Sequence, residues 1–222
     1  MGSKRFVSGE IVPRPVWSVE RRVKTAVACG LVVGLAAVAA VAASGIARAA
    51  VACNSMQEQP FLRWSDSAYY VLAPGGAIEP GTNTWALSAG AAIVAGNEPF
   101  RVHSSTDNHS LYLPSGSSAT TNMVCLGLTY PTLRFFAVNT GSASTHLEVL
   151  VYFRSGAGTL LGSATITSLF ATSTWAPTSL IPILGNATAP IGTEYVQFRF
   201  APAGPDSGWR IDDVYVDPWS SR

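Results

Sequence analysis

Two adjacent carboxylates near the C-terminus are the residues best placed to do chemistry. Asp212 and Asp213 lie in the run Arg210–Val216, whose other residues are mostly apolar. As a β-strand, this run would place Asp212 on the face of Val214 and Asp213 on the face of Ile211. Both faces are apolar, and an unpaired buried charge is costly, so at least one carboxylate must find a cation or become neutral.

The partner of these carboxylates can come from the chain or from solvent. Arg63, Arg101 and Arg134 are the candidate ion-pair partners, and neighbouring backbone amides are a further set of donors. Carboxylate oxygens also suit calcium, which an exported protein meets in abundance. These alternatives stay open at the level of sequence.

The segment 102–110 brings two histidines and an acid together. His103, Asp107 and His109 stand among serines, so a Ser-His-Asp set is conceivable. A triad is recognised by geometry rather than by sequence proximity, and this polar, turn-like segment favours a solvated loop. The sequence lacks Gly-x-Ser-x-Gly, His-Glu-x-x-His and a phosphate-binding glycine loop, and it marks no carboxylate pair for glycoside hydrolysis. It therefore favours a protein without enzymatic activity.

Cys53 and Cys125 are expected to form a disulfide. The third cysteine, Cys29, lies in the N-terminal apolar segment, and two cysteines in an exported domain indicate one disulfide. Closure of a loop of this length would add on the order of 4 kcal/mol to stability. A catalytic thiol would require a nearby base and a reducing compartment, and the sequence indicates neither.

The first 49 residues have the features of a targeting segment. A basic region precedes an uncharged run, Thr25–Ala47, that consists mostly of Ala, Val, Gly and Leu. Small residues at 47–50 fit the rule for signal-peptide cleavage. We therefore predict a signal peptide over 1–49, a secreted protein, and one domain over 50–222. An uncleaved anchor helix that holds the protein at the cell surface is the alternative, because the run is long enough to span a bilayer.

The remainder of the chain is acidic. Of the 14 Lys and Arg, seven lie at or before Arg48, whereas only two of the 13 Asp and Glu, Glu10 and Glu20, lie there. The predicted domain therefore carries eleven acids against seven arginines. An acidic balance without a basic stripe repels phosphates, which excludes nucleic acid as a partner.

The elements that must position these groups are short strands. Apolar residues alternate with polar ones in His146–Arg154 and Tyr195–Phe200, and turns rich in Pro, Gly and Asn separate the strand patterns. This arrangement predicts an all-β fold, a two-sheet antiparallel β-sandwich of the jelly-roll type. The other expected strands are 68–72, 85–87, 100–103, 111–113, 121–126, 133–138, 159–166 and 210–216.

Two segments resemble a known family. Residues 75–85, Gly-Gly-Ala-Ile-Glu-Pro-Gly-Thr-Asn-Thr-Trp, are similar to the opening of galactose-binding-like jelly rolls, notably the carbohydrate-binding modules of cellulases and xylanases. Residues 209–216 resemble their closing strand, with its aliphatic-Asp-Asp-Val core. The resemblance implies the fold, a carbohydrate-binding role and a structural Ca²⁺ ion. Its ligands would be Glu79 and Asp212, with Asp213 as the substitute.

Aromatic side chains near turns are the candidate sugar-binding residues. Trp64, Tyr70, Tyr112 and Trp209 form this set, because a sugar platform needs flat exposed rings; capping of the sandwich edges is the alternative. Three functions stay open. The first is an exported, non-catalytic module that binds polysaccharide or cell-envelope glycan. The second is a small secreted polysaccharide hydrolase or lyase, and the third a structural or adhesive surface protein.

Overall fold

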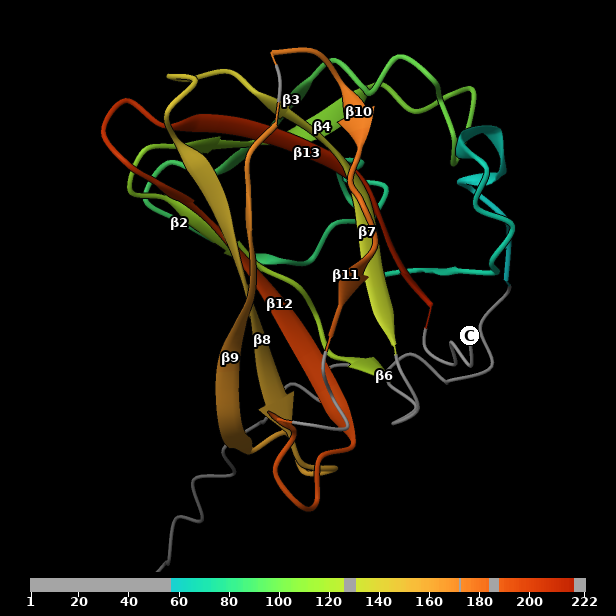
Figure 1. The fold of residues 1–222 in the computed structure, drawn as a ribbon, viewed down its shortest axis with the longest axis vertical. Coiled ribbons are helices and arrows are strands. Elements are labelled where there is room, and N and C mark those ends of the chain that lie inside the picture. Colours follow the sequence, from blue (N-terminus) through green and yellow to red (C-terminus); the bar gives the residue numbers. More distant parts are fainter. Residues whose placement is uncertain (1–56, 126–130, 172, 184–187, 218–222) are drawn as a thin grey trace, which may run out of the picture. The chain divides into compact units, whose positions relative to one another are not determined.

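A computed structural model describes residues 57–125, 131–171, 173–183 and 188–217, which form two antiparallel β-sheets (Figure 1). The predicted all-β, two-sheet sandwich is confirmed. The predicted targeting segment, residues 1–49, lies outside the described residues. Among the described residues, no helix has the length and apolar character needed to cross a membrane.

The seven-stranded sheet is built around its two longest strands, β7 and β13, which lie side by side. Its strand order is β10-β7-β13-β4-β3, with β1 paired to β13 and β11 paired to β7. Its strands are β1 (Val71–Leu72), β3 (Ala92–Ala95), β4 (His109–Pro114), β7 (Thr132–Asn139), β10 (Ala176–Pro177), β11 (Ile181–Pro182) and β13 (Gly208–Asp217).

The six-stranded sheet has the order β2-β5-β12-β8-β9, with β6 paired to β12. Its central pair runs from Tyr195 opposite Arg154 to Ala203 opposite His146 without interruption. Its strands are β2 (Ala86–Ser88), β5 (Ser118–Thr120), β6 (Val124–Cys125), β8 (His146–Arg154), β9 (Leu160–Leu169) and β12 (Tyr195–Ala203).

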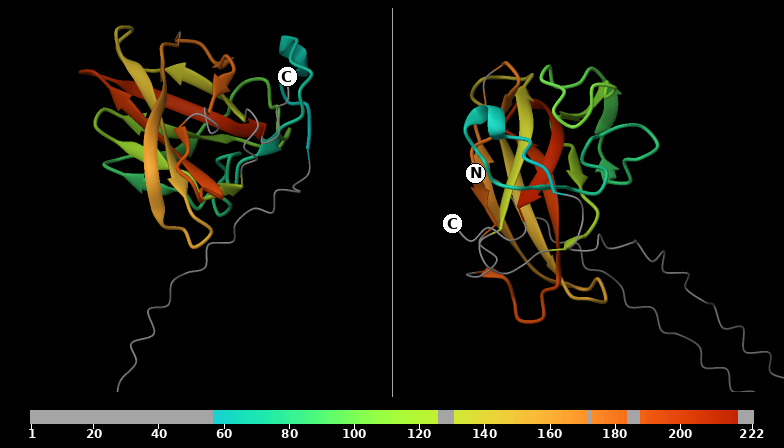
Figure 2. Two further views of the ribbon diagram at one scale, coloured as in Figure 1. Left: turned by 60° about the horizontal axis from the view of Figure 1, so that its bottom comes forward. Right: turned by 90° about the vertical axis from the view of Figure 1, so that its right-hand side faces the viewer.

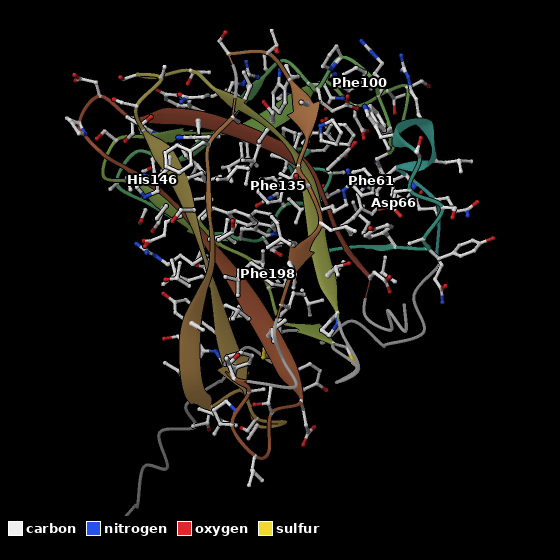
Figure 3. All side chains as sticks on the ribbon, viewed as in Figure 1. Phe61, Asp66, Phe100, Phe135, His146 and Phe198 are labelled. Carbon is white, nitrogen blue, oxygen red and sulfur yellow. The ribbon has the colours of Figure 1, made fainter. Side chains whose placement is uncertain are left out.

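The main hydrophobic core fills the space between the two sheets. Along β8, every second residue from Leu147 to Phe153 is buried, as the sequence pattern predicts for a strand with one covered face. Phe135 of β7 and Phe198 of β12 both belong to this core, which they enter from opposite sheets (Figure 3). Burial of large apolar side chains here is the main stabilising contribution to the fold.

A second, smaller hydrophobic cluster covers the outer face of the seven-stranded sheet. The segment before β1 crosses the outer face of β7 and β13 and includes the short 3₁₀ helix η1 (Leu62–Trp64) (Figure 2). The four fully buried members of the cluster, Phe61, Tyr70, Phe136 and Tyr215, form what we call the outer aromatic cluster. Both faces of β7 and β13 are therefore covered, and every residue of β7 is buried.

One buried ion pair fastens this covering segment to the sheet. Arg134 of β7 donates from Nη1 to Asp66 Oδ2 at 2.8 Å, and its Nε and Nη2 donate to the carbonyl oxygen of Thr178. The hydroxyl of Tyr70 donates to the same Asp66 oxygen at 2.7 Å. The Arg134 guanidinium also lies over the Phe61 ring, 4.2 Å from its centroid.

One expected strand, 100–103, is wrong. Glu98 accepts the amides of Phe100 and Val102 with its side chain, so these amides have no sheet partner. Arg101 also has a φ of 51°, which is incompatible with an extended strand. The short strands β3, β5, β10 and β11 escape the sequence pattern because they are only two to four residues long.

Candidate functional site

A β-bulge in β13 decides where the two adjacent carboxylates lie. The pairing of β13 with β7 shifts register between Asp212 and Tyr215, and Asp213 has a φ of 47°. The extra residue breaks the alternation, so Ile211 and Val214 both point into the main core. The predicted sharing of faces, Asp212 with Val214 and Asp213 with Ile211, is therefore wrong.

The opening motif of the resemblance packs directly on this bulge. Val214 donates its amide to the carbonyl of Gly76 at 3.1 Å, and its own carbonyl accepts the amide of Ala73 at 2.8 Å. A Cβ on Gly76 would meet the carbonyl oxygen of Val214 at 2.6 Å, so only glycine permits this approach. The two motifs that resemble carbohydrate-binding modules are thus neighbours in space.

Asp212 and Asp213 are both fully buried, and both accept backbone amides. Asp212 accepts the amide of Glu98 at Oδ2 (3.1 Å) and that of Asp213 at Oδ1 (2.9 Å). Asp213 accepts the amide of His103 at Oδ2 (3.1 Å). Of the alternatives that the sequence leaves open, backbone amides are the partners that the structure shows. The bonds from Glu98 and His103 tie β13 to the loop 96–108, more than 100 residues away in the chain.

The expected arginine partners are all engaged elsewhere. Arg134 pairs with Asp66, Arg101 donates to the carbonyl of Ser105, and Arg63 lies over the rings of Trp64 and Phe100. In the described ranges, no arginine forms an ion pair with either aspartate of the bulge. In the part of the chain that the structure describes, no strong base therefore balances a negative charge on either carboxylate.

Burial makes ionisation of these acids costly. Burial, together with the charge of Asp213, raises the pKa of Asp212 to about 9. Burial also raises the pKa of Asp213 to about 7, with the amide of His103 acting against it and the charge of Glu98 adding to it. The pKa of Glu98 is raised by burial as well, although the amides of Val102 and Phe100 oppose this.

His103, Asp107 and Asp213 form a compact group of three metal-ligating side chains, which we call the bulge triad. Their ligand atoms all lie within 4.8 Å of one another. His103 Nδ1 lies 2.7 Å from Asp107 Oδ2. Burial acts to lower the pKa of His103, but the hydrogen bond and charge of Asp107 outweigh it and raise the pKa.

One atom of the bulge triad is left without a partner. Asp213 Oδ1 is buried and accepts no hydrogen bond within the described part of the chain. A buried carboxylate oxygen without a donor is unfavourable unless a proton or a cation satisfies it. The residues present therefore fit a metal ion.

Glu79 does not belong to the bulge triad. Its Oε1 accepts the amides of Asn108 and His109 at 2.7 and 3.0 Å, and its Oε2 lies 2.7 Å from His109 Nδ1. Burial acts to raise its pKa, but these hydrogen bonds outweigh it and the pKa lies below its usual value. Calcium bound by Glu79 and Asp212, with Asp213 as substitute, stays a prediction.

The Ser-His-Asp set that the segment 102–110 suggests does not assemble into a triad. His103 and Asp107 do pair, but in the described residues no serine or threonine hydroxyl bonds to His103. The Ser104 hydroxyl instead meets that of Thr106 at 2.8 Å. Histidine and aspartate without a nucleophile are more consistent with a metal site than with acyl transfer.

The outer face of the six-stranded sheet carries a different set of polar and aromatic side chains. Residues that pair directly across antiparallel strands point to the same face, so Tyr195 and Arg154 point outward together, as do Gln197 with Tyr152 and Arg199 with Leu150. We call the five polar and aromatic members of this group the outer sheet face: Tyr152, Arg154, Tyr195, Gln197 and Arg199.

Hydrogen bonds fix part of the outer sheet face. Arg154 Nε donates to Gln197 Oε1 at 2.8 Å, and Gln197 Nε2 donates to the carbonyl of Thr121 at 2.8 Å. Tyr152, Tyr195 and Arg199 are half-buried beside them. In the described ranges, neither Arg154 nor Arg199 pairs with a carboxylate.

The four aromatic residues predicted to bind sugar lie apart from the outer sheet face. Tyr70 and Trp209 are fully buried, Tyr70 in the outer aromatic cluster and Trp209 in the main core, so their selection as exposed rings is wrong. Trp64 is half-buried and packs edge-on against Phe100 and Phe136. Tyr112, on β4, is 36% exposed.

Cys125 ends β6 and is disulfide-bonded. Its predicted partner, Cys53, lies outside the described residues. The pairing of the two therefore stays a prediction.

The alternation of apolar and polar residues along β8 and β12 could have revealed the outer sheet face. It places Tyr152 and Arg154 on the face of β8 that points away from the buried Val151 and Phe153. The bulge triad had a weaker signal. His103 and Asp107 are four residues apart in a recognisably polar loop, but nothing in the sequence joins that loop to Asp213.

No family model matches the sequence, and no curated protein matches it. Among solved structures, a CBM22-1 xylan-binding domain from Paenibacillus barcinonensis is 12% identical, with a TM-score of 0.45 over 66% of this chain and 94% of its own. The C-terminal family 22 carbohydrate binding module from Clostridium thermocellum is 16% identical, with a TM-score of 0.43 over 69% and 96%.

The enzymatically active domain of bacteriophage CBA120 tailspike protein 4 is 16% identical, with a TM-score of 0.44 over 65% of this chain, which spans 20% of that one. Modules of the class that the sequence resembles are therefore among the similar structures.

Proposed function

We propose that this chain is an exported, non-catalytic module that binds polysaccharide on the outer sheet face. The observation that carries the proposal is the pairing on β8 and β12 of two tyrosine rings with hydrogen-bonding side chains already held in place. Tyr152 and Tyr195 supply apolar ring surface, and Arg154 and Arg199 supply donors. The buried Gln197 holds the Arg154 guanidinium in place. Sugars present both apolar C–H faces and hydroxyls, so a site for them needs both kinds of group.

Rigidity adds to the suitability of this face. The nine-residue register of β8 with β12 is uninterrupted, and the Arg154–Gln197–Thr121 hydrogen bonds order two side chains before any ligand arrives. Preorganised side chains lose less conformational entropy on binding, which matters for a ligand with weak individual contacts. The resemblance of the opening and closing motifs to carbohydrate-binding modules points to the same ligand class.

Retention of the whole protein on insoluble polysaccharides, followed by titration with soluble fragments, tests the proposal. Tyr152→Ala and Tyr195→Ala should each weaken binding about tenfold or more, since each removes a stacking surface. Tyr69→Ala is the matched control, because Tyr69 is 55% exposed and lies outside the six-stranded sheet. Equal losses in all three variants, or no binding to any polysaccharide, would overturn the assignment.

A further inference from the structure

The bulge triad stands apart from the outer sheet face and from every contact used in the proposed function. It lies between the loop 96–108 and β13 of the seven-stranded sheet, whereas the proposed glycan site lies on β8 and β12 of the other sheet. Its two carboxylates are buried, with Asp213 at 0% and Asp107 at 5% exposure. The His103 side chain is 34% exposed, so the group is open to solvent on one side.

We propose that His103, Asp107 and Asp213 bind a divalent transition-metal ion of the zinc class, which fastens the loop 96–108 to β13. One imidazole nitrogen and two carboxylate oxygens are the donors. Imidazole suits zinc, copper, iron and nickel ions, whereas calcium and magnesium favour oxygen donors alone. Three protein ligands with a solvent-accessible side would leave one position for water.

One observation independent of the cluster's composition supports a bound cation. Asp213 Oδ1 is fully buried and has no hydrogen-bond donor in the described residues, while its Oδ2 accepts the His103 amide, which turns this carboxylate toward the loop. Asp107 Oδ2 lies 2.7 Å from His103 Nδ1, so two of the three donors already converge. A metal ion would displace the proton shared by His103 and Asp107 and would satisfy the orphan oxygen.

Glu98 organises the loop next to the bulge triad. Glu98 accepts the amides of Phe100 and Val102 and donates its own amide to Asp212, so the loop is shaped without help from a metal. The ion would add a direct link between positions 103, 107 and 213. It would also offset the repulsion that the charges of Glu98 and Asp107 exert on Asp213.

Thermal unfolding of the whole, chelator-stripped protein tests this site. At a free Zn²⁺ concentration about a hundredfold above its Kd, the midpoint should rise by about 5–10 °C, because only the folded state presents the three ligands together. Ca²⁺ at the same concentration should produce a much smaller rise. Bound Co²⁺ should give a visible absorption band characteristic of mixed nitrogen and oxygen ligands, with one ion per chain.

His103→Gln and Asp213→Asn should remove the Zn²⁺ shift and the Co²⁺ band. His109→Gln is the matched control, since His109 is a half-buried histidine in the same region that bonds to Glu79 instead. If a variant is too unstable to melt cleanly, the Co²⁺ band of His103→Gln, whose side chain is part-exposed, still decides. An equal or larger rise with Ca²⁺, or a Zn²⁺ shift that survives His103→Gln, would overturn the proposal, as would the absence of any metal effect. None of these results depends on glycan binding.

Discussion

The outer face of one sheet of the sandwich is covered, whereas that of the other is partly exposed. The seven-stranded sheet is covered by the segment before β1, which buries Phe136 and Tyr215 under Phe61 and Tyr70. The six-stranded sheet leaves the outward residues of β8 half-buried and those of β9 partly exposed. A covered face stabilises the fold and can hold buried charge, whereas an open face remains available to a ligand.

The largest difference in the free energy of unfolding is expected between two variants that each lose one aromatic ring, one for each sheet. Phe136→Ala should lower the free energy of unfolding by about 4 kcal/mol, because it removes a fully buried ring that packs against Phe61, Trp64 and Phe100. Phe170→Ala, at a ring that is 67% exposed beside His146, should cost less than about 1 kcal/mol. Urea unfolding of both variants measures the difference, and similar losses would mean that the covering segment contributes little.

A smaller difference in stability is expected between substitutions of two arginines, one on each sheet. Arg134→Met should destabilise the protein by about 3 kcal/mol, since it leaves Asp66 buried beside an apolar chain and frees the carbonyl of Thr178. Arg154→Met breaks only half-exposed hydrogen bonds on the open face and should cost about 1 kcal/mol or less. If Arg134→Met were as stable as Arg154→Met, the ion pair would not fasten the covering segment.

The same contrast explains what the sequence could predict. The pattern of β8 identifies its strand and its inward residues, because one face meets the core and the other meets solvent. In β7 and β13 both faces are covered, so nearly every residue is buried and no alternation marks the two sides. Tyr70 and Trp209 look accessible in the sequence because they lie near turns, but tertiary packing buries Tyr70 in the outer aromatic cluster and Trp209 in the main core.

The carboxylates show a further limit of sequence reasoning. Burial of Asp212 and Asp213 follows from their apolar neighbours, and the structure confirms it. The bulge at Asp213 and the arrival of His103, 110 residues away, follow from tertiary packing that no local pattern contains. Sequence therefore indicated that these acids need partners, but it could not identify them.

The stability of the metal-free protein, measured in the presence of a chelator, should depend on pH because of the buried acids on the covered face. The pKa of Asp212 is about 9 and that of Asp213 about 7 in the folded protein, above the ordinary 3.8. The folded state therefore binds more protons than the unfolded state between about pH 4 and pH 9, and stability falls as pH rises through this range. We expect a loss of at least about 1 kcal/mol between pH 5 and pH 8.

Asp212→Asn and Asp213→Asn should flatten this dependence, because an amide in the same place does not titrate. The measurement is the urea midpoint of each protein at several pH values in the presence of chelator. Stability that rises with pH in the unsubstituted protein would contradict the raised pKa values.

The smallest effect concerns the charge on the open face. Arg199 points outward from β12 next to Leu150 and has no carboxylate partner in the described residues, so its guanidinium is free to meet a ligand. Arg199→Ala should weaken polysaccharide binding about three- to tenfold without a matching loss of stability, since a half-exposed hydrogen bond to a ligand contributes about 1 kcal/mol.

Arg199→Lys separates two roles of this side chain, because lysine keeps the charge and loses the planar fork of donors. If Arg199→Lys binds a uronate-containing polysaccharide as well as the unsubstituted protein does, Arg199 acts through its charge, and salt should weaken the binding. If Arg199→Lys binds neither neutral nor acidic glycans, Arg199 acts through directional hydrogen bonds. Arg63→Ala, at an exposed arginine on the segment that covers the other sheet, is the matched control, and an equal loss in that variant would show that Arg199 acts only through net charge.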